Sequence, residues 1–224
     1  ILHAVMVQTG YRRIVGSDPA AAELVDVSFR DASDQTWYPG AALFGEGIFI
    51  MLDEPEGPPL QLVGSSATAW SNLFQNPKQY SDSLFRFRGR ASELHPVFVW
   101  WHTVAHLLIR ALSLDSGYSG ASIRERVYLE PKDERTRGAT VLYTVQQGAD
   151  GSLGGMLSLV PKFGRILQRV AEAASHCSND PLCYEQRVRA GSYSGSSCYA
   201  CLLLSETSCE HRNMWLDRKV VLDV

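Results

Sequence analysis

The sequence predicts an α+β fold, with a mixed sheet and packed helices. Segments typical of strands come first and then alternate with segments typical of helices. Hydrophobic residues make up 45% of the 224 residues and aromatic residues 10%, which is enough for a sizeable core. The formal net charge is −3, so the surface as a whole differs from that of a basic nucleic-acid-binding domain.

Residues 1–60 are expected to form a β-rich N-terminal part. Residues 1–15 alternate loosely between apolar and polar side chains, as a strand does. Further on, "GEG" separates the apolar runs "AALF" and "IFIML", which predicts strand, glycine turn and strand. The chain opens on "ILHAVMVQTGY" without an initiator methionine, so we expect it to be a C-terminal fragment of a longer protein.

Residues 61–176 are expected to form an α/β core. A short helix is predicted over 67–76, and Pro96 opens the longest helix, which ends before Gly117. The apolar stripe of this helix recurs at helical spacing and consists of Phe98, Trp101, Ala105, Leu108 and Leu112. The strands "RERVYLEP" and "GATVLYTVQQ" follow, and then a helix over 157–176. The last stretch, "RKVVLDV", is expected to be a strand.

Five cysteines lie together in the remaining residues, 177–224. Their pattern is Cys177-x5-Cys183, fourteen further residues, and then Cys198-x2-Cys201-x7-Cys209. A C-x-x-C turn brings two thiolates to one tetrahedral ion, and two sulfurs from outside the turn close the site. Metal binding would also order a loop-rich segment that has few apolar residues. The sequence therefore predicts a C-terminal zinc-binding module with a four-cysteine knuckle.

Cys198, Cys201 and Cys209 are the expected ligands, while Cys183 and Cys177 are alternatives for the fourth place. Cys183 is favoured because it lies closer to the knuckle along the chain. Four sulfurs leave no open position, so this zinc would be structural. A thioredoxin-like dithiol and free buried thiols are the other interpretations. Clustered cysteines, with neither a membrane-length apolar run nor a secretory signal, favour the cytoplasm.

A rival metal site is "HTVAH", in which His102 and His106 are four residues apart on the predicted helix. This spacing puts two imidazoles on one face, as in the zinc-protease pattern H-E-x-x-H. Thr103 stands where that pattern has its general-base glutamate. We therefore expect hydrogen-bonded core histidines, and the alternative is a zinc-dependent hydrolase or nuclease that uses His102 and His106.

Two further stretches could contact phosphates. "DGSLGGM" lacks the lysine of a P-loop and is expected to be a strand-to-helix turn, or a backbone site for a phosphate. "FRFRGR" places Arg86, Arg88 and Arg90 at alternate positions, so a strand would direct all three to one face. There they could bind successive phosphates of DNA, and the alternative is a solvated charged face.

Several stretches occur in the same order in a known family. They are "GEGIF", "HTVAHLLIRALSLDSGYSGASIRERVY", "LYT" with "DGSLGG", "CSNDPLC" and "CYACLLLSETSCEHRNMWLDR". Together they resemble the C-terminal zinc-binding domain of the DrmB family of the DISARM anti-phage defence system. The same domain type follows the motor of MrfA-like DEAD/DEAH helicases. The resemblance covers about residues 1–224 and is most specific from Cys198 through Asn213 to Asp217.

The resemblance implies zinc as the cofactor, with Cys198, Cys201, Cys209 and one cysteine of "CSNDPLC" as ligands, and no catalytic residues. It also implies a DrmA-like, DEAD/DEAH-type helicase subunit as partner, in a complex that engages phage DNA. The fourteen residues before Cys198 exceed the usual spacing in the helicase members, so the fourth ligand stays open. The expected function is that of a non-catalytic, zinc-stabilised, helicase-associated module of an antiviral defence complex that supports DNA binding.

Overall fold

The computed structural model describes residues 2–13, 23–52, 60–75, 95–132, 135–146, 153–189 and 192–222. Helices and strands are both present, so the predicted α+β class is confirmed. The chain divides into two compact units. One contains Ile1–Glu46 and Val145–Leu153, and the other contains Gly47–Thr144 and Gly154–Val224. The second unit therefore holds the long predicted helix together with all five cysteines.

The first unit consists of antiparallel strand pairs. β1 (Leu2–Val7) pairs with the first half of β6 (Gly40–Met51), and Leu2 lies opposite Gly45. The other pairs join β2 (Gly10–Arg13) to β3 (Glu23–Asp26), and β4 (Phe29–Arg30) to β5 (Thr36–Trp37). The polar stretch up to about residue 36 thus contains short strands for which the sequence gives no alternating signal.

β6 continues through "GEG", so the expected glycine turn is wrong. Gly47 instead permits a close approach to β8 (Arg135–Gln146). A Cβ atom at Gly47 would lie 3.2 Å from the carbonyl oxygen of Leu142 and 3.2 Å from Cβ of Tyr143. A glycine inside a strand can serve such a close backbone contact as well as a turn, and here it does so.

The strand order of the main sheet is β1-β6-β8-β7, which places β7 (Ile123–Lys132) at an edge. β7 and β8 pair antiparallel, with Glu125 opposite Leu142, so the two strands predicted in this region are confirmed. Glu125 shares its strand face with the fully buried Ile123, although it is a charged residue. This face of β7 is directed into the protein.

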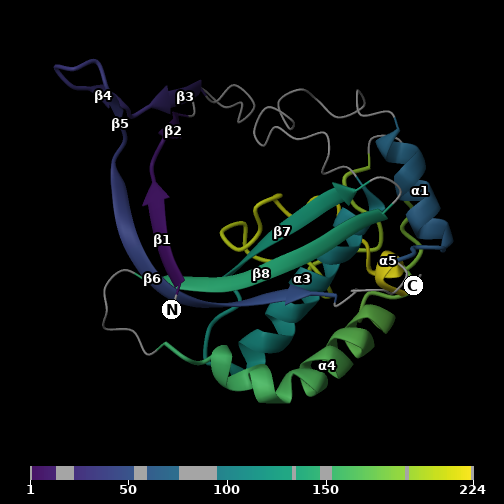
Figure 1. Ribbon diagram of the computed structural model, residues 1–224. Helices are drawn as coiled ribbons and strands as arrows, with labels where there is room; N and C mark the ends of the chain where they lie inside the picture. Colours follow the sequence, from purple (N-terminus) through teal and green to yellow (C-terminus); the bar gives the residue numbers. More distant parts are fainter. Residues whose placement is uncertain are drawn as a thin grey trace. The chain divides into compact units, whose positions relative to one another are not determined.

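α3 (Pro96–Asp115) is the central helix of the second unit (Figure 1). It begins at Pro96, as predicted, and Nδ1 of His95 caps it by accepting a hydrogen bond from the Val97 amide at 3.1 Å. It packs against β7, α1 (Ser65–Phe74), α4 (Phe163–Ser175) and α5 (Arg218–Leu222). Its length and hydropathy would allow a membrane span, but 78% of its most apolar window is buried, as in a core helix.

Two helical segments differ from the predictions near the C-terminus. The helix expected over 157–176 starts with a 3-10 segment, η4 (Leu157–Lys162), which contains Pro161, and only α4 is α-helical. The final strand expected in "RKVVLDV" is wrong, because Arg218–Leu222 forms α5. Val220 of α5 is fully buried, and a short apolar run of this kind fits a buried helix as well as a strand.

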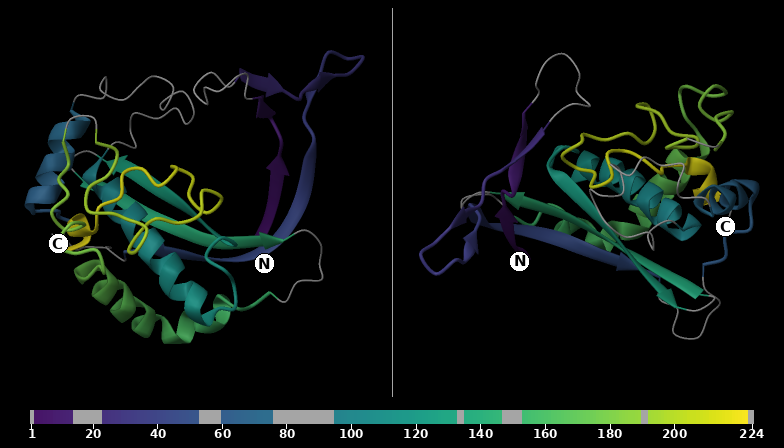
Figure 2. Two further views of the ribbon diagram at one scale, coloured as in Figure 1. Left: turned by 180° about the vertical axis from the view of Figure 1, so that it is seen from behind. Right: turned by 90° about the horizontal axis from the view of Figure 1, so that it is seen from above.

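The cysteine-rich segment lies along α3 (Figure 2). Arg110 of α3 donates to the carbonyl oxygen of Ala200 at 2.8 Å. On the side of the sheet, the Glu125 amide of β7 donates to the carbonyl oxygen of Ser208 at 3.1 Å. The segment therefore contacts both the central helix and the edge strand.

Candidate metal centre

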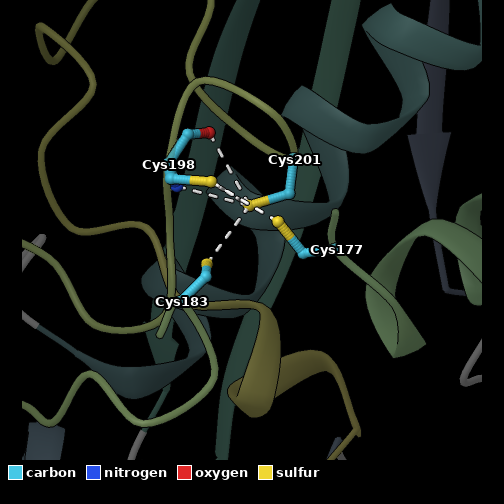
Figure 3. Close-up of side chains that lie close together, drawn as sticks. All are labelled: Cys177, Cys183, Cys198 and Cys201. Carbon is cyan, nitrogen blue, oxygen red and sulfur yellow. Dashed lines mark hydrogen bonds between the residues drawn. The ribbon is translucent and has the colours of Figure 1, made fainter. Parts of the chain in front are cut away.

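Four cysteines from two loops converge in the second unit: Cys177, Cys183, Cys198 and Cys201 (Figure 3). Their Sγ atoms all lie within 4.8 Å of one another. The Sγ–Sγ distance is 3.4 Å for Cys177 and Cys198, and 3.7 Å both for Cys183 and Cys201 and for Cys198 and Cys201. Tetrahedral zinc with Zn–S bonds of about 2.3 Å separates its sulfurs by about 3.8 Å. A disulfide would need about 2.05 Å, so the spacing is that of a zinc–thiolate site.

Asp180 shapes the loop between Cys177 and Cys183. Its carboxylate accepts hydrogen bonds from the amides of Cys177 and Tyr184, each at 3.0 Å. The fully buried side chain of Arg218, at the start of α5, donates to the same carboxylate. Arg218 also interacts with the sulfur of Cys183. Four thiolates around a divalent ion carry a net charge of −2. The guanidinium of Arg218 lies beside this group and offsets part of that charge.

The second loop is the C-x-x-C turn. The carbonyl oxygen of Cys198 accepts hydrogen bonds from the amides of Cys201 and Leu202 at 3.1 and 2.9 Å. The amide of Cys198 points at Sγ of Cys201 at 3.3 Å. Asn179, from the first loop, directs its backbone amide to Sγ of Cys177 and its side-chain amide to Sγ of Cys198, both at 3.4 Å. Such N–H donors stabilise thiolates, the form in which cysteine binds metals.

The thiols need a cation between them in order to ionise together. Burial, together with repulsion from neighbouring sulfurs, raises the pKa of Cys183 to about 11 and also raises the pKa of Cys201. Burial opposes ionisation of Cys198 as well, but hydrogen bonds from Cys177 and from the backbone lower its pKa to about 6. A divalent ion would supply the missing positive charge. The chemistry of this group therefore fits zinc.

The structure places Cys209 apart from the other expected ligands. Its Sγ lies 3.2 Å from Nε2 of His102, in a different group of side chains. Cys177 and Cys183, considered as alternatives for one place, both lie in the four-cysteine group, so that each loop contributes a pair. Cys209 is close to the C-x-x-C turn along the chain, and for this reason the sequence favours it as a ligand of the same ion. In the folded protein its side chain instead lies against His102 of α3. The signal available in the sequence is the pairing itself, C-x5-C with C-x-x-C.

Arg86, Arg88 and Arg90 lie outside the described residues, as do Asp150, Gly151 and Ser152 of "DGSLGGM". The expectations for these segments therefore remain predictions from the sequence.

Two comparisons with known proteins show what this chain is similar to. Residues 104–202 match the family described as MZB, the MrfA Zn-binding domain. The matched range contains the four clustered cysteines and ends before Cys209. The chain is also 30% identical over 234 residues to the DISARM protein DrmB of Bacillus paralicheniformis (strain ATCC 9945a / NCIMB 11709 / CD-2).

The resemblance to DrmB and to the MrfA zinc-binding domain is confirmed. The alignment with DrmB covers 99% of this chain and 39% of that relative. The four-cysteine group fits zinc, and the family that residues 104–202 match is a zinc-binding domain. Zinc is therefore the metal that both observations indicate.

Proposed function

We propose that this DrmB-like chain is a non-catalytic, zinc-stabilised module of a bacterial anti-phage defence complex. In this proposal it acts in the cytoplasm, pairs with a DEAD/DEAH-type helicase subunit of the DrmA kind, and supports DNA binding. The observation that carries the proposal is the similarity to the DISARM protein DrmB along 99% of the chain. Since the chain spans about 39% of that relative, the helicase-binding surface can also involve other parts of the whole protein.

The zinc ligands in this proposal are Cys177, Cys183, Cys198 and Cys201. Their mutual distances, their amide donors and the neighbouring Arg218 support the assignment. Bound zinc would cross-link the two loops. Four protein ligands leave no position for water or substrate, which supports a structural rather than a catalytic role.

The partner proposal is tested by purifying the full-length protein together with its helicase subunit. We expect the helicase to co-elute with the tagged wild-type protein and to be largely lost with the variant Cys201→Ser, which removes a ligand of the four-cysteine group. A DEAD/DEAH helicase from outside the defence system serves as the control and should elute separately. A cognate helicase that elutes alone from the wild-type protein would contradict the partner assignment.

The DNA proposal is tested at Arg86, Arg88 and Arg90, which alternate along "FRFRGR". Replacing all three with alanine in the full-length complex should weaken DNA binding and make it less sensitive to salt. Each lost phosphate contact should flatten the slope of log K against log salt by about 0.7–0.9. DNA titrations at several salt concentrations measure this slope.

A matched control removes the same charge elsewhere, by alanine at the exposed residues Arg165, Arg187 and Arg189. This variant should keep the wild-type slope. If both triple variants flatten the slope equally, the effect comes from overall charge and the assignment to "FRFRGR" fails. An unchanged slope in the first variant also contradicts it.

A further inference from the structure

A second group of metal-binding side chains lies apart from the four cysteines. It consists of His102, His106, Glu125 and Cys209, and is called the His–Glu–Cys cluster below. The two histidines and Glu125 are 0% exposed, and Cys209 is 5% exposed. Each residue offers one ligand atom, and these atoms all lie within 4.8 Å of one another. A carboxylate, a thiol and two imidazoles are seldom gathered in a protein interior without a partner of opposite charge.

The cluster joins three elements that are far apart in the sequence. His102 and His106 lie on one face of α3, since they are four residues apart. Glu125 comes from the inward face of β7, which packs against α3. Cys209 comes from the loop that hydrogen-bonds to the edge of β7 through Ser208. A ligand shared by all four would fix the cysteine-rich segment to the helix and to the sheet.

The distances around His102 match a tetrahedral zinc ion. Its Nε2 lies 3.2 Å from Sγ of Cys209 and 3.4 Å from Oε1 of Glu125. Bonds to zinc of about 2.05 Å for nitrogen, 2.1 Å for oxygen and 2.3 Å for sulfur would separate these pairs by about 3.6 and 3.4 Å. The ligand atoms are therefore already close to the spacing that the ion requires.

Neighbouring backbone groups orient His106 and Cys209. Nδ1 of His106 lies 2.9 Å from the carbonyl oxygen of Leu202, which can only accept, so this nitrogen carries the proton and Nε2 keeps its lone pair. That Nε2 is buried and has no hydrogen-bond partner among the described residues. Sγ of Cys209 accepts from the amides of His211 and Asn213 at 3.3 and 3.2 Å. Metal-binding side chains are commonly fixed in this way by groups one layer further out.

The charge of the donor set fits a divalent cation. One carboxylate and one thiolate carry two negative charges, and the two imidazoles are neutral when they bind a metal. A zinc ion makes the whole cluster neutral, which allows it to be buried completely. Without a cation, an ionised carboxylate and thiolate in this position would each cost several kcal/mol of desolvation.

A cysteine–histidine–glutamate triad explains the cluster less well. In a triad the nucleophile and the carboxylate bind opposite nitrogens of the histidine. Here Cys209 and Glu125 both approach Nε2 of His102, and Nδ1 has no hydrogen-bond partner within the described part of the chain. The full burial of the histidines also leaves no route for a substrate.

We propose that His102, His106, Glu125 and Cys209 bind a second zinc ion, and that this ion is structural. Four protein ligands close the coordination sphere, so the ion has no open position for the water that a hydrolase would activate. Thr103, between the histidines, accepts a hydrogen bond from the Asp217 amide at 3.0 Å and so has a structural contact of its own. The proposal replaces the expectation that the two histidines are metal-free core residues.

The first test counts zinc in the purified full-length protein by elemental mass spectrometry. The double substitution His102→Gln and His106→Gln should lose one zinc per chain relative to wild type. Cys209→Ser should lose the same single equivalent, although it leaves the four-cysteine group intact. The matched control His3→Gln, from the other compact unit, should lose none. A double variant that keeps the full wild-type zinc content overturns the proposal.

The second test uses the wild-type protein and so does not depend on whether a variant folds. X-ray absorption at the zinc edge should show sulfur ligands at about 2.3 Å together with nitrogen or oxygen ligands at about 2.0–2.1 Å. A shell made of sulfur alone would overturn the second site, and so would a different metal in the protein at the same stoichiometry. Both tests read metal content and ligation, so their outcome is independent of helicase and DNA binding.

Discussion

Replacing Cys201 with serine is expected to remove at least one zinc ion per chain and to unfold the segment around residues 177–215, which also contains Cys209. Serine does not replace a thiolate as a zinc ligand, and three sulfurs hold the ion poorly. Binding of a structural zinc contributes on the order of 10 kcal/mol to the folding of such segments, so most of this stabilisation would be lost. Elemental analysis measures the zinc, and amide hydrogen exchange or limited proteolysis of the full-length protein locates the unfolding.

The control is Tyr199→Ser, which lies inside the same C-x-x-C turn but has a side chain that is 84% exposed. It should keep both the zinc and the protection from exchange. Cys177→Ser and Cys183→Ser should each behave like Cys201→Ser, because the structure brings both sulfurs to the group. If Cys201→Ser keeps the full zinc content, the assignment of the four-cysteine group as a zinc site is wrong. If Cys177→Ser alone keeps the full zinc content, Cys177 is not a zinc ligand.

The local parts of the metal centre could be predicted from the sequence. A C-x-x-C turn needs only its own backbone to bring two sulfurs together, so Cys198 and Cys201 are evident without a fold. Pro96 and the apolar spacing that follows it also predict α3 well, because helix starts and helical periodicity are local signals.

The non-local parts could not be predicted in the same way. Glu125 looks like one of several charged residues in "RERVY", and only the packing of β7 against α3 shows that its face is the buried one. Cys209 is close to the knuckle in the sequence, but the hydrogen bond between Glu125 and Ser208 holds its loop against β7. The position of Cys209 is therefore decided by sheet and helix packing, and its distance from the other cysteines along the chain does not show it.

The second large effect is expected at Asp217, the last residue of the specific stretch that begins at Cys198. Its carboxylate accepts hydrogen bonds from Nε1 of Trp70 at 3.0 Å and from the amides of Ser196 and Lys219 at 3.0 and 3.1 Å. Its own amide donates to Oγ1 of Thr103 at 3.0 Å. Asp217 thus connects α1, α3 and α5 to Ser196, which lies just before the C-x-x-C turn. Its side chain is buried, with only 2% of the residue exposed.

Asp217→Ala should therefore destabilise the protein by about 3–5 kcal/mol, since it leaves three donors without their acceptor in a buried place. Asp217→Asn should cost less. Burial raises the pKa of Asp217 even though Trp70 and the amides donate to it, so its charged form is held against a desolvation cost that asparagine does not have. An asparagine oxygen can still accept from Ser196 and Lys219, and only the bond from Trp70 meets an amide nitrogen instead.

The order of stabilities follows from this network. Thermal unfolding of the full-length protein, with hydrogen exchange over residues 192–222, should rank wild type above Asp217→Asn and Asp217→Asn above Asp217→Ala. Trp70→Phe removes one donor, and it should make Asp217→Asn less harmful than it is in the wild-type background. Asp115→Ala is the matched control, because that carboxylate is 43% exposed and its pair with Arg169 lies at the surface. If Asp217→Ala and Asp115→Ala are equally stable, the hydrogen bonds of Asp217 do not stabilise the packing of the segment around Ser196 against α1 and α3.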